Sequence, residues 1–268
     1  MSTTEPIPKK NTLRNYHHIL PKFSSSFPDR DLESISSDEI LSFLTQLTEG
    51  TKQATKRSQY ALLSAFFTLV KNTLDPKLIN PCDTVMLRKL FRPAKAPQWT
   101  ILDKEVIDEI VFRTVKNRDR LMLELMGWGG LRVGELLRLT PRDVEDQKLI
   151  LRSPKSGREA EVVFIPHKLG LRLKEYIRDR GMRPDQKIFP IGYAAARIIV
   201  RKAGRLVGVE LRPHDLRRHA ATYASRSGTP IEIVSKVILR HANLSTTQRY
   251  LGKVSEVEAV RWIENLYG

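Results

Sequence analysis

Apolar residues recur at helical spacing along most of the chain. A first helix is predicted from Asn11 to Pro21, where the proline is expected to end the apolar series. Ser36 and Glu39 have the spacing of a capping box and predict the start of a second helix. A third helix is predicted over residues 53–72. We expect its buried face to consist of five apolar residues: Leu62, Ala65, Phe66, Leu69 and Val70.

A segment without periodicity follows this helical region. Residues 91–98 read FRPAKAPQ, and their prolines and basic side chains are typical of an extended, solvated linker. The sequence therefore predicts a domain boundary at this point. We expect four parts: a tail (1–11), a helical domain (12–90), a linker (91–99) and a second domain (100–268).

The second predicted domain combines helices with two strands. A helix is expected after Asp103, with an apolar face that reaches Val115, and a buried helix is expected over residues 121–126. Residues 148–152 and 160–165 have strand patterns, and the polar turn between them predicts a hairpin. The predicted fold class is mainly α with a small antiparallel β-sheet.

The charge balance indicates which class of partner the protein binds. The chain has 46 Lys and Arg against 30 Asp and Glu, a formal net charge of +16, which favours a polyanion such as DNA or RNA. Cys82 is the only cysteine, which excludes a disulfide framework and favours a reducing compartment such as the cytoplasm. No apolar run approaches the roughly 18 residues of a membrane span, so no membrane partner is expected.

Polar residues interrupt otherwise apolar segments at three places. At the first, Arg132 and Glu135 lie three residues apart near the start of a helix predicted around Leu131. They share a helix face, so Glu135 can hold the guanidinium of Arg132. Taken alone, the pair also fits a structural salt bridge.

At the second place, His214 and Arg217 lie three residues apart near a helix start, where backbone N–H groups favour anions. Arg218 is an alternative to Arg217. His214 and His219 are five residues apart, whereas paired helical zinc ligands prefer a spacing of four. A solvated basic helix explains this segment as well.

At the third place, His241 lies at a predicted helix end and Tyr250 follows nine residues later. A lone tyrosine is most often a half-buried core residue. A catalytic role for Tyr250 therefore depends on its position relative to the other two groups of polar residues.

In type and in order, these groups resemble the tyrosine recombinases, also called the phage integrase family. The resemblance rests on G-L-R-x-x-E, a lysine in a hairpin, H-x-L-R, a histidine after a leucine-rich helix and a tyrosine nine residues later. It covers nearly the whole chain. It implies a helical core-binding domain and a catalytic domain that together form a C-shaped clamp on DNA.

The resemblance implies a set of catalytic residues: Arg132, Lys155, His214, Arg217, His241 and Tyr250. Tyr250 is the implied nucleophile, and Arg132 and Arg217 hold the non-bridging oxygens of the scissile phosphate. His214 and His241 are the remaining donors. Fixed cationic donors stabilise the charge that gathers on phosphate oxygens in the transition state.

Two further residues support this implied chemistry. Glu135 orients the first arginine, and Lys155 protonates the leaving 5′-hydroxyl, with Lys148 and Arg158 as nearby alternatives. A phosphotyrosyl bond conserves the energy of the phosphodiester, so ATP is not required. No cofactor and no metal are expected, because the sequence offers no carboxylate cluster for a divalent ion.

Double-stranded DNA is the implied partner, and most basic residues are expected to contact phosphates. The predicted DNA contacts are Lys52, Lys56, Arg57, Arg218 and Arg240. Arg240 stands where the family usually has a glycine before the histidine. The sequence leaves two interpretations of Arg240 open, an altered backbone around His241 and an additional phosphate contact.

The last helix carries Val257, Val260, Trp262, Ile263 and Leu266. It can pack on its own domain or, as the resemblance implies, dock on a neighbouring protomer to form a cyclic homotetramer on two DNA sites.

The implied function is site-specific recombination through a 3′-phosphotyrosyl intermediate, for integration, excision or dimer resolution, by a nucleoid-associated enzyme. Xer resolvases and small mobile-element integrases are both similar. A catalytically silent DNA-binding regulator and an enzyme of the type IB topoisomerase kind are the alternatives.

Overall fold

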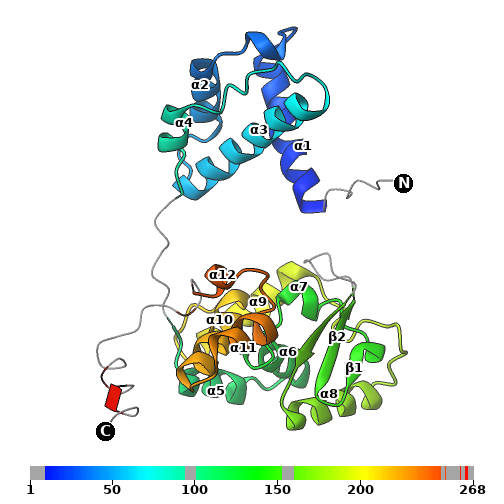
Figure 1. Ribbon diagram of the computed structural model, residues 1–268. Coiled ribbons are helices and arrows are strands. Elements are labelled where there is room, and N and C mark those ends of the chain that lie inside the picture. The colour runs from blue at the N-terminus through cyan, green and yellow to red at the C-terminus, as the bar shows by residue number, and fades with distance from the viewer. Residues whose placement is uncertain are drawn as a thin grey trace, which may run out of the picture. The chain divides into compact units, whose positions relative to one another are not determined.

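The computed structural model describes residues 10–93, 101–152 and 160–248, together with positions 251, 260, 263 and 264 (Figure 1). The chain divides into two compact units, Met1–Pro97 and Gln98–Gly268. The division falls within the predicted linker. The described residues are mostly helical with one three-stranded antiparallel sheet, which confirms the predicted fold class.

The first unit consists of helices. They are α1 (Lys10–Ser26), the 3-10 turn η1 (Leu32–Ser34), α2 (Ser37–Leu47), α3 (Gln53–Thr73) and α4 (Val85–Leu90). Both α1 and α2 pack against α3. The predicted capping box is confirmed at α2, where the Ser36 hydroxyl accepts from the backbone N–H of Glu39 and the Glu39 carboxylate accepts from that of Ser36.

Two predictions for this unit are wrong. Pro21 lies inside α1, which continues to Ser26. A helix-interior proline loses one backbone hydrogen bond, and here the burial of Phe23 against Phe43 and Phe67 offsets that loss. The buried residues of α3 are Tyr60, Leu63 and Phe67, whereas the predicted core residue Leu69 is exposed.

The second unit contains the sheet. Its helices are α5 (Lys104–Arg113), α6 (Asn117–Gly127), α7 (Val133–Leu136), α8 (His167–Asp179), α9 (Tyr193–Arg205), α10 (Pro213–Arg226), α11 (Ile231–Ile233) and α12 (Leu244–Gln248). A 3-10 turn, η2 (Pro141–Asp143), and a π-helical turn, η3 (Val234–Ile238), complete them. Helix α6, in which residues 121–127 are all buried, packs against α5, α8 and α10.

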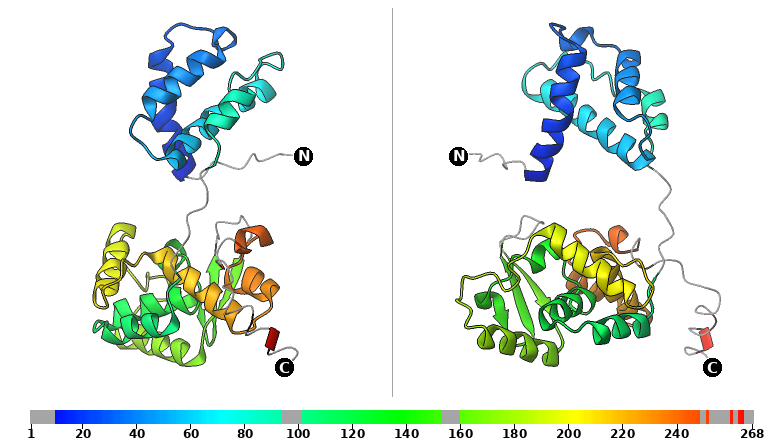
Figure 2. Two further views of the ribbon diagram at one scale, coloured as in Figure 1. Left: turned by 90° about the vertical axis from the view of Figure 1, so that its left-hand side faces the viewer. Right: turned by 180° about the vertical axis from the view of Figure 1, so that it is seen from behind.

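The strands β1 (Val144–Glu145), β2 (Lys148–Arg152) and β3 (Ala160–Phe164) are antiparallel in the order β1-β2-β3. They gather at one side of the second unit (Figure 2). The predicted strands correspond to β2 and β3, and β1 was not predicted. On β3 the inward positions are Val163 and Glu161, so one buried position opposite Leu151 carries a carboxylate.

Two expectations for the helices of this unit are corrected. Helix α5 ends at Arg113, which leaves Val115 exposed outside the predicted apolar face. The helix expected around Leu131 is the single turn α7, because the segment before it turns at Gly130. None of the described helices has both the length and the apolar composition that crossing a membrane requires.

Candidate active site

The segment between α6 and α7 brings Arg132 to the start of α7. Gly130 has a φ of +62°, and a Cβ at this position would lie 3.0 Å from the backbone oxygen of Ile238. A glycine therefore lets this segment pack against the end of η3. Arg132 is the N-cap residue of α7, and its side chain is 31% exposed, so it is accessible to a ligand.

Glu135 holds Arg132 from the buried side. Its Oε1 accepts from Nη1 of Arg132 at 2.6 Å, and its Oε2 accepts from the Arg132 backbone N–H at 2.8 Å. Burial favours the protonated carboxyl, but the charge of Arg240 and the hydrogen bonds from Arg132 outweigh it and lower the pKa of Glu135 below its ordinary value. Glu135 is therefore an anion that orients Arg132.

Arg217 ties two segments of the site together. It lies in α10 and is only 1% exposed. Its Nη1 donates to the backbone oxygen of Gly130, and its Nη2 donates to that of Leu239. One guanidinium therefore connects α10 with the segments that precede Arg132 and His241.

His214 occupies the first turn of the same helix. Pro213 is the first helical residue, as its position in the sequence predicted. The partial loss of hydration around His214 and the charges of Arg218, Arg217 and Arg132 lower the pKa of the imidazole. His214 is therefore neutral at pH 7, with solvent access.

His241 follows η3 and is held by two contacts. Nδ1 of His241 lies 3.0 Å from Oγ1 of Thr247, and this Thr247 hydroxyl donates to Oγ of Ser235. The backbone N–H of His241 donates to the backbone oxygen of Ser235. Burial, followed by the charges of Arg217 and Arg132, lowers the pKa of His241 to about 4. The sequence alone did not single out Thr247, although the S-T-T-Q stretch after His241 was a usable signal.

We expect the folded protein to lose stability as the pH falls from about 6.5 to about 4. Over this interval the unfolded chain protonates His241, whose ordinary pKa is about 6.5, while the folded protein keeps it neutral. The unfolded state then binds up to about one more proton, so the free energy of unfolding decreases with falling pH. Thermal unfolding of wild type and His241→Gln tests this, because the variant should show a shallower loss. An identical slope in both proteins would contradict it.

The structure brings four predicted catalytic residues together from separate segments: Arg132, His214, Arg217 and His241. The hydrogen bonds of Arg217 link α10 to both neighbouring segments. The charges of Arg132 and Arg217 also act on both imidazoles. The result is a cationic site with neutral imidazoles, suited to an anionic ligand.

The chain is similar to known proteins over most of its length. The model of the phage integrase family matches residues 101–256, more than half of the sequence. The chain belongs to the phage integrase family. The tyrosine recombinase XerA of Pyrococcus horikoshii is 30% identical over 281 residues, which cover 97% of this chain and 90% of the relative.

A second relative agrees with this membership, and a solved structure shares the fold. The tyrosine recombinase XerA of Saccharolobus solfataricus is 26% identical over 232 residues, covering 84% of this chain and 76% of the relative. The solved structure of the XerH site-specific recombinase has a TM-score of 0.70 at 21% identity and covers 96% of this chain and 79% of that one. The prediction of a Xer-like tyrosine recombinase is thus confirmed.

Two of the catalytic residues predicted for this phage integrase lie outside the described residues, Lys155 and Tyr250. The hairpin that carries Lys155 is described at its base, where Arg152 pairs with Ala160. Beside Tyr250, Leu251 packs against a buried cluster that includes Leu239, the residue whose oxygen accepts from Arg217.

The structure does not support DNA contacts for Arg218 and Arg240. The side chain of Arg218 is buried and pairs with Asp215 on its own helix at 3.0 Å. The side chain of Arg240 is 3% exposed and pairs with Glu135 at 2.8 Å. A guanidinium enclosed with a carboxylate is not available to a phosphate, so both residues are corrected to interior ion pairs.

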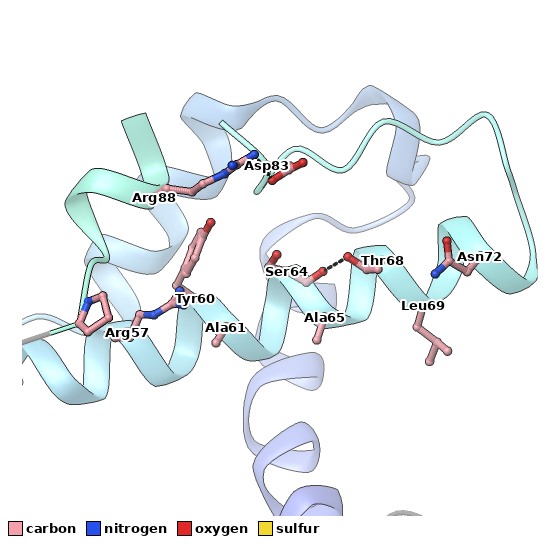
Figure 3. A pocket seen from close by; sticks show the side chains of 11 residues that line it. Arg57, Tyr60, Ala61, Ser64, Ala65, Thr68, Leu69, Asn72, Asp83 and Arg88 are labelled. Atoms are coloured by element: carbon pink, nitrogen blue, oxygen red, sulfur yellow. Dashed lines mark hydrogen bonds and ion pairs between the residues drawn. The ribbon is translucent and has the colours of Figure 1, made fainter. Parts of the chain in front are cut away.

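The other three predicted DNA contacts lie at the start of α3. Lys52 is exposed at the N-cap, and Lys56 and Arg57 are partly exposed in the first turns. Arg57 lies over the ring of Tyr60, at the edge of a pocket of about 780 Å³ along α3 (Figure 3). Farther along α3 the pocket is lined by Ser64, Thr68 and Asn72. Hydroxyl, amide and guanidinium groups along one helix suit a phosphate backbone.

Across the described ranges, no cluster of three His, Cys, Asp or Glu side chains is placed to hold a metal ion.

Proposed function

We propose that this phage integrase is a site-specific DNA recombinase that cleaves and rejoins strands through a 3′-phosphotyrosyl intermediate on Tyr250. The observation that carries the proposal is the convergence of Arg132, Arg217 and two neutral imidazoles on one cationic site. Attack by a tyrosine on a phosphodiester needs fixed donors of this kind, and it needs no redox or nucleotide cofactor.

The arginines stabilise the transition state. Attack places additional negative charge on the non-bridging oxygens, and Arg132 and Arg217 are already oriented before DNA arrives, Arg132 by Glu135 and Arg217 by two backbone oxygens. Because little reorganisation remains, each guanidinium contributes fully to lowering the barrier.

The proton transfers follow from the protonation states. His214 and His241 are neutral at pH 7. Thr247 donates its hydroxyl proton to Ser235, so Nδ1 of His241 carries the ring proton and Nε2 keeps a lone pair that can accept the tyrosine proton. The neutral ring of His214 can offer its N–H to the phosphate. The Tyr250 oxygen forms its bond to phosphorus as the bond to the 5′-oxygen breaks, and Lys155 protonates that leaving oxygen. A 5′-hydroxyl from another strand then reverses these steps and rejoins the DNA.

Duplex DNA is the proposed substrate, and the enzyme acts as an oligomer. XerH was solved with its palindromic difH substrate in a post-cleavage complex. By analogy, both units of this chain contact DNA, the first through Lys52, Lys56 and Arg57. We place the reaction in the cytoplasm on nucleoid DNA, in a tetramer on two sites that the C-terminal helix joins between protomers.

Trapping the intermediate on genomic fragments tests this proposal. We expect wild-type protein incubated with fragmented DNA of its source organism, in EDTA, to form adducts that survive denaturation in SDS. Sequencing the trapped fragments should reveal one enriched site. DNA binding without any covalent adduct would contradict the proposed function.

A further inference from the structure

We infer that Arg240 positions Arg132 for phosphate binding, through a buried ion pair that it forms with the carboxylate of Glu135. A second buried carboxylate, that of Glu161 on β3, pairs with the same guanidinium. The inference rests on the proposed function, because the positioned group acts only when a phosphate is bound. It replaces both earlier interpretations of Arg240.

The backbone at Arg240 has a conformation that favours glycine over arginine. Its φ is +52°, in the left-handed region that side chains with a Cβ rarely adopt. The family glycine would adopt this conformation without strain. An arginine here therefore implies a gain from its side chain.

The contacts of the guanidinium show what that gain is. Nη2 of Arg240 lies 2.8 Å from Oε2 of Glu135, and Nε lies 3.4 Å from Oε2 of Glu161. Nη1 donates to the backbone oxygen of Ile238 at 2.8 Å. One side chain thus connects the Arg132 segment, the hairpin and the end of η3.

The buried charges balance only with this arginine present. Glu161 is 4% exposed and Glu135 is 2% exposed. Among the described residues, Arg240 is the only ion-pair partner of Glu161, whereas Glu135 also pairs with Arg132. Two guanidinium groups therefore face two carboxylates, and removal of Arg240 leaves a buried anion beside a site that must bind a phosphate.

The shared carboxylate explains how Arg240 acts on Arg132. Arg240 binds Oε2 of Glu135, while Oε1 accepts from Nη1 of Arg132. With Oε2 fixed, the carboxylate cannot rotate, and Oε1 stays aligned with the partly exposed guanidinium of Arg132. Glu161 adds a charge contact to the same guanidinium from β3, at the base of the hairpin that carries Lys155.

The test compares Arg240→Gly with Arg240→Lys in single-turnover cleavage at saturating DNA. Glycine suits the backbone, so any loss belongs to the guanidinium. We expect the cleavage rate constant to fall about tenfold or more in Arg240→Gly and less in Arg240→Lys, while DNA affinity stays within about twofold. Adding Glu161→Gln to Arg240→Gly should restore stability but not the rate, because it removes the unpaired anion while the Glu135 carboxylate stays unfixed.

Arg172→Ala is the matched control. Arg172 pairs at 2.6 Å with Glu124, which is also a buried carboxylate, but this pair joins α8 to α6 and touches none of the site residues. We expect a similar loss of thermal stability with an unchanged cleavage rate. A wild-type cleavage rate in Arg240→Gly would overturn the inference. So would a loss of cleavage rate in both Arg240→Gly and Arg172→Ala in proportion to their loss of stability.

The two proposals fail in different ways. If wild type forms no adduct in the same assay, the proposed function falls and the inference falls with it. If wild type forms the adduct and Arg240→Gly forms it equally fast, only the inference falls.

Discussion

Replacing Tyr250 by phenylalanine is expected to abolish the covalent adduct while leaving DNA binding intact. The substitution removes one oxygen and keeps the ring, so the fold and the phosphate contacts remain. Loss of a sole nucleophile typically reduces turnover by roughly 10⁴-fold or more. The measurement uses a substrate nicked near the cleavage site, from which the short 5′-hydroxyl strand diffuses away and traps the intermediate.

Tyr223→Phe is the control for this prediction. Tyr223 is half-exposed on α10 and stacks on His219, with ring centroids 5.8 Å apart. Its hydroxyl has no part in the proposed reaction, so the variant should form adduct at the wild-type rate. Adduct formation by Tyr250→Phe would show that another group attacks the phosphate.

Replacing Arg217 by lysine should reduce the cleavage rate by roughly 100- to 1000-fold. A lysine has one nitrogen, whereas the guanidinium of Arg217 donates to both Gly130 and Leu239 and must also reach the phosphate. We also expect a loss of stability of about 1–3 kcal/mol, because a buried backbone oxygen loses its donor. Single-turnover cleavage and thermal unfolding measure the two effects.

Arg218→Lys provides the comparison, since the sequence alone left Arg217 and Arg218 as alternatives. Arg218 pairs with Asp215 on its own helix, a contact that a lysine can keep. Its cleavage rate should stay within a few-fold of wild type. A larger loss in Arg218→Lys than in Arg217→Lys would reverse the assignment of the second arginine.

Local rules predicted those parts of the fold that depend on neighbouring residues. The capping box at Ser36, the proline at the start of α10 and the strands β2 and β3 each follow from a short pattern. The approach of Arg132 and Glu135 also follows from helical spacing. The order of the motifs along the chain identified the family, because the same residue types follow one another in the same order in its members.

Tertiary packing decided what the sequence could not. Pro21 does not end α1, because Phe23 is buried beyond it, and Leu69 is exposed because α1 and α2 cover another face of α3. Arg240 was predicted to contact DNA, as its charge suggests. Its carboxylate partners Glu135 and Glu161 are 105 and 79 residues away in the chain, so no local pattern reveals them.

The most direct test of the central claim is to locate the covalent bond. Wild-type protein trapped on the nicked substrate would be digested with nuclease and trypsin, and the modified peptide identified by mass spectrometry. The account predicts a nucleotide joined through its 3′-phosphate to the peptide that contains Tyr250. A nucleotide on any other residue, or one joined through a 5′-phosphate, would contradict it.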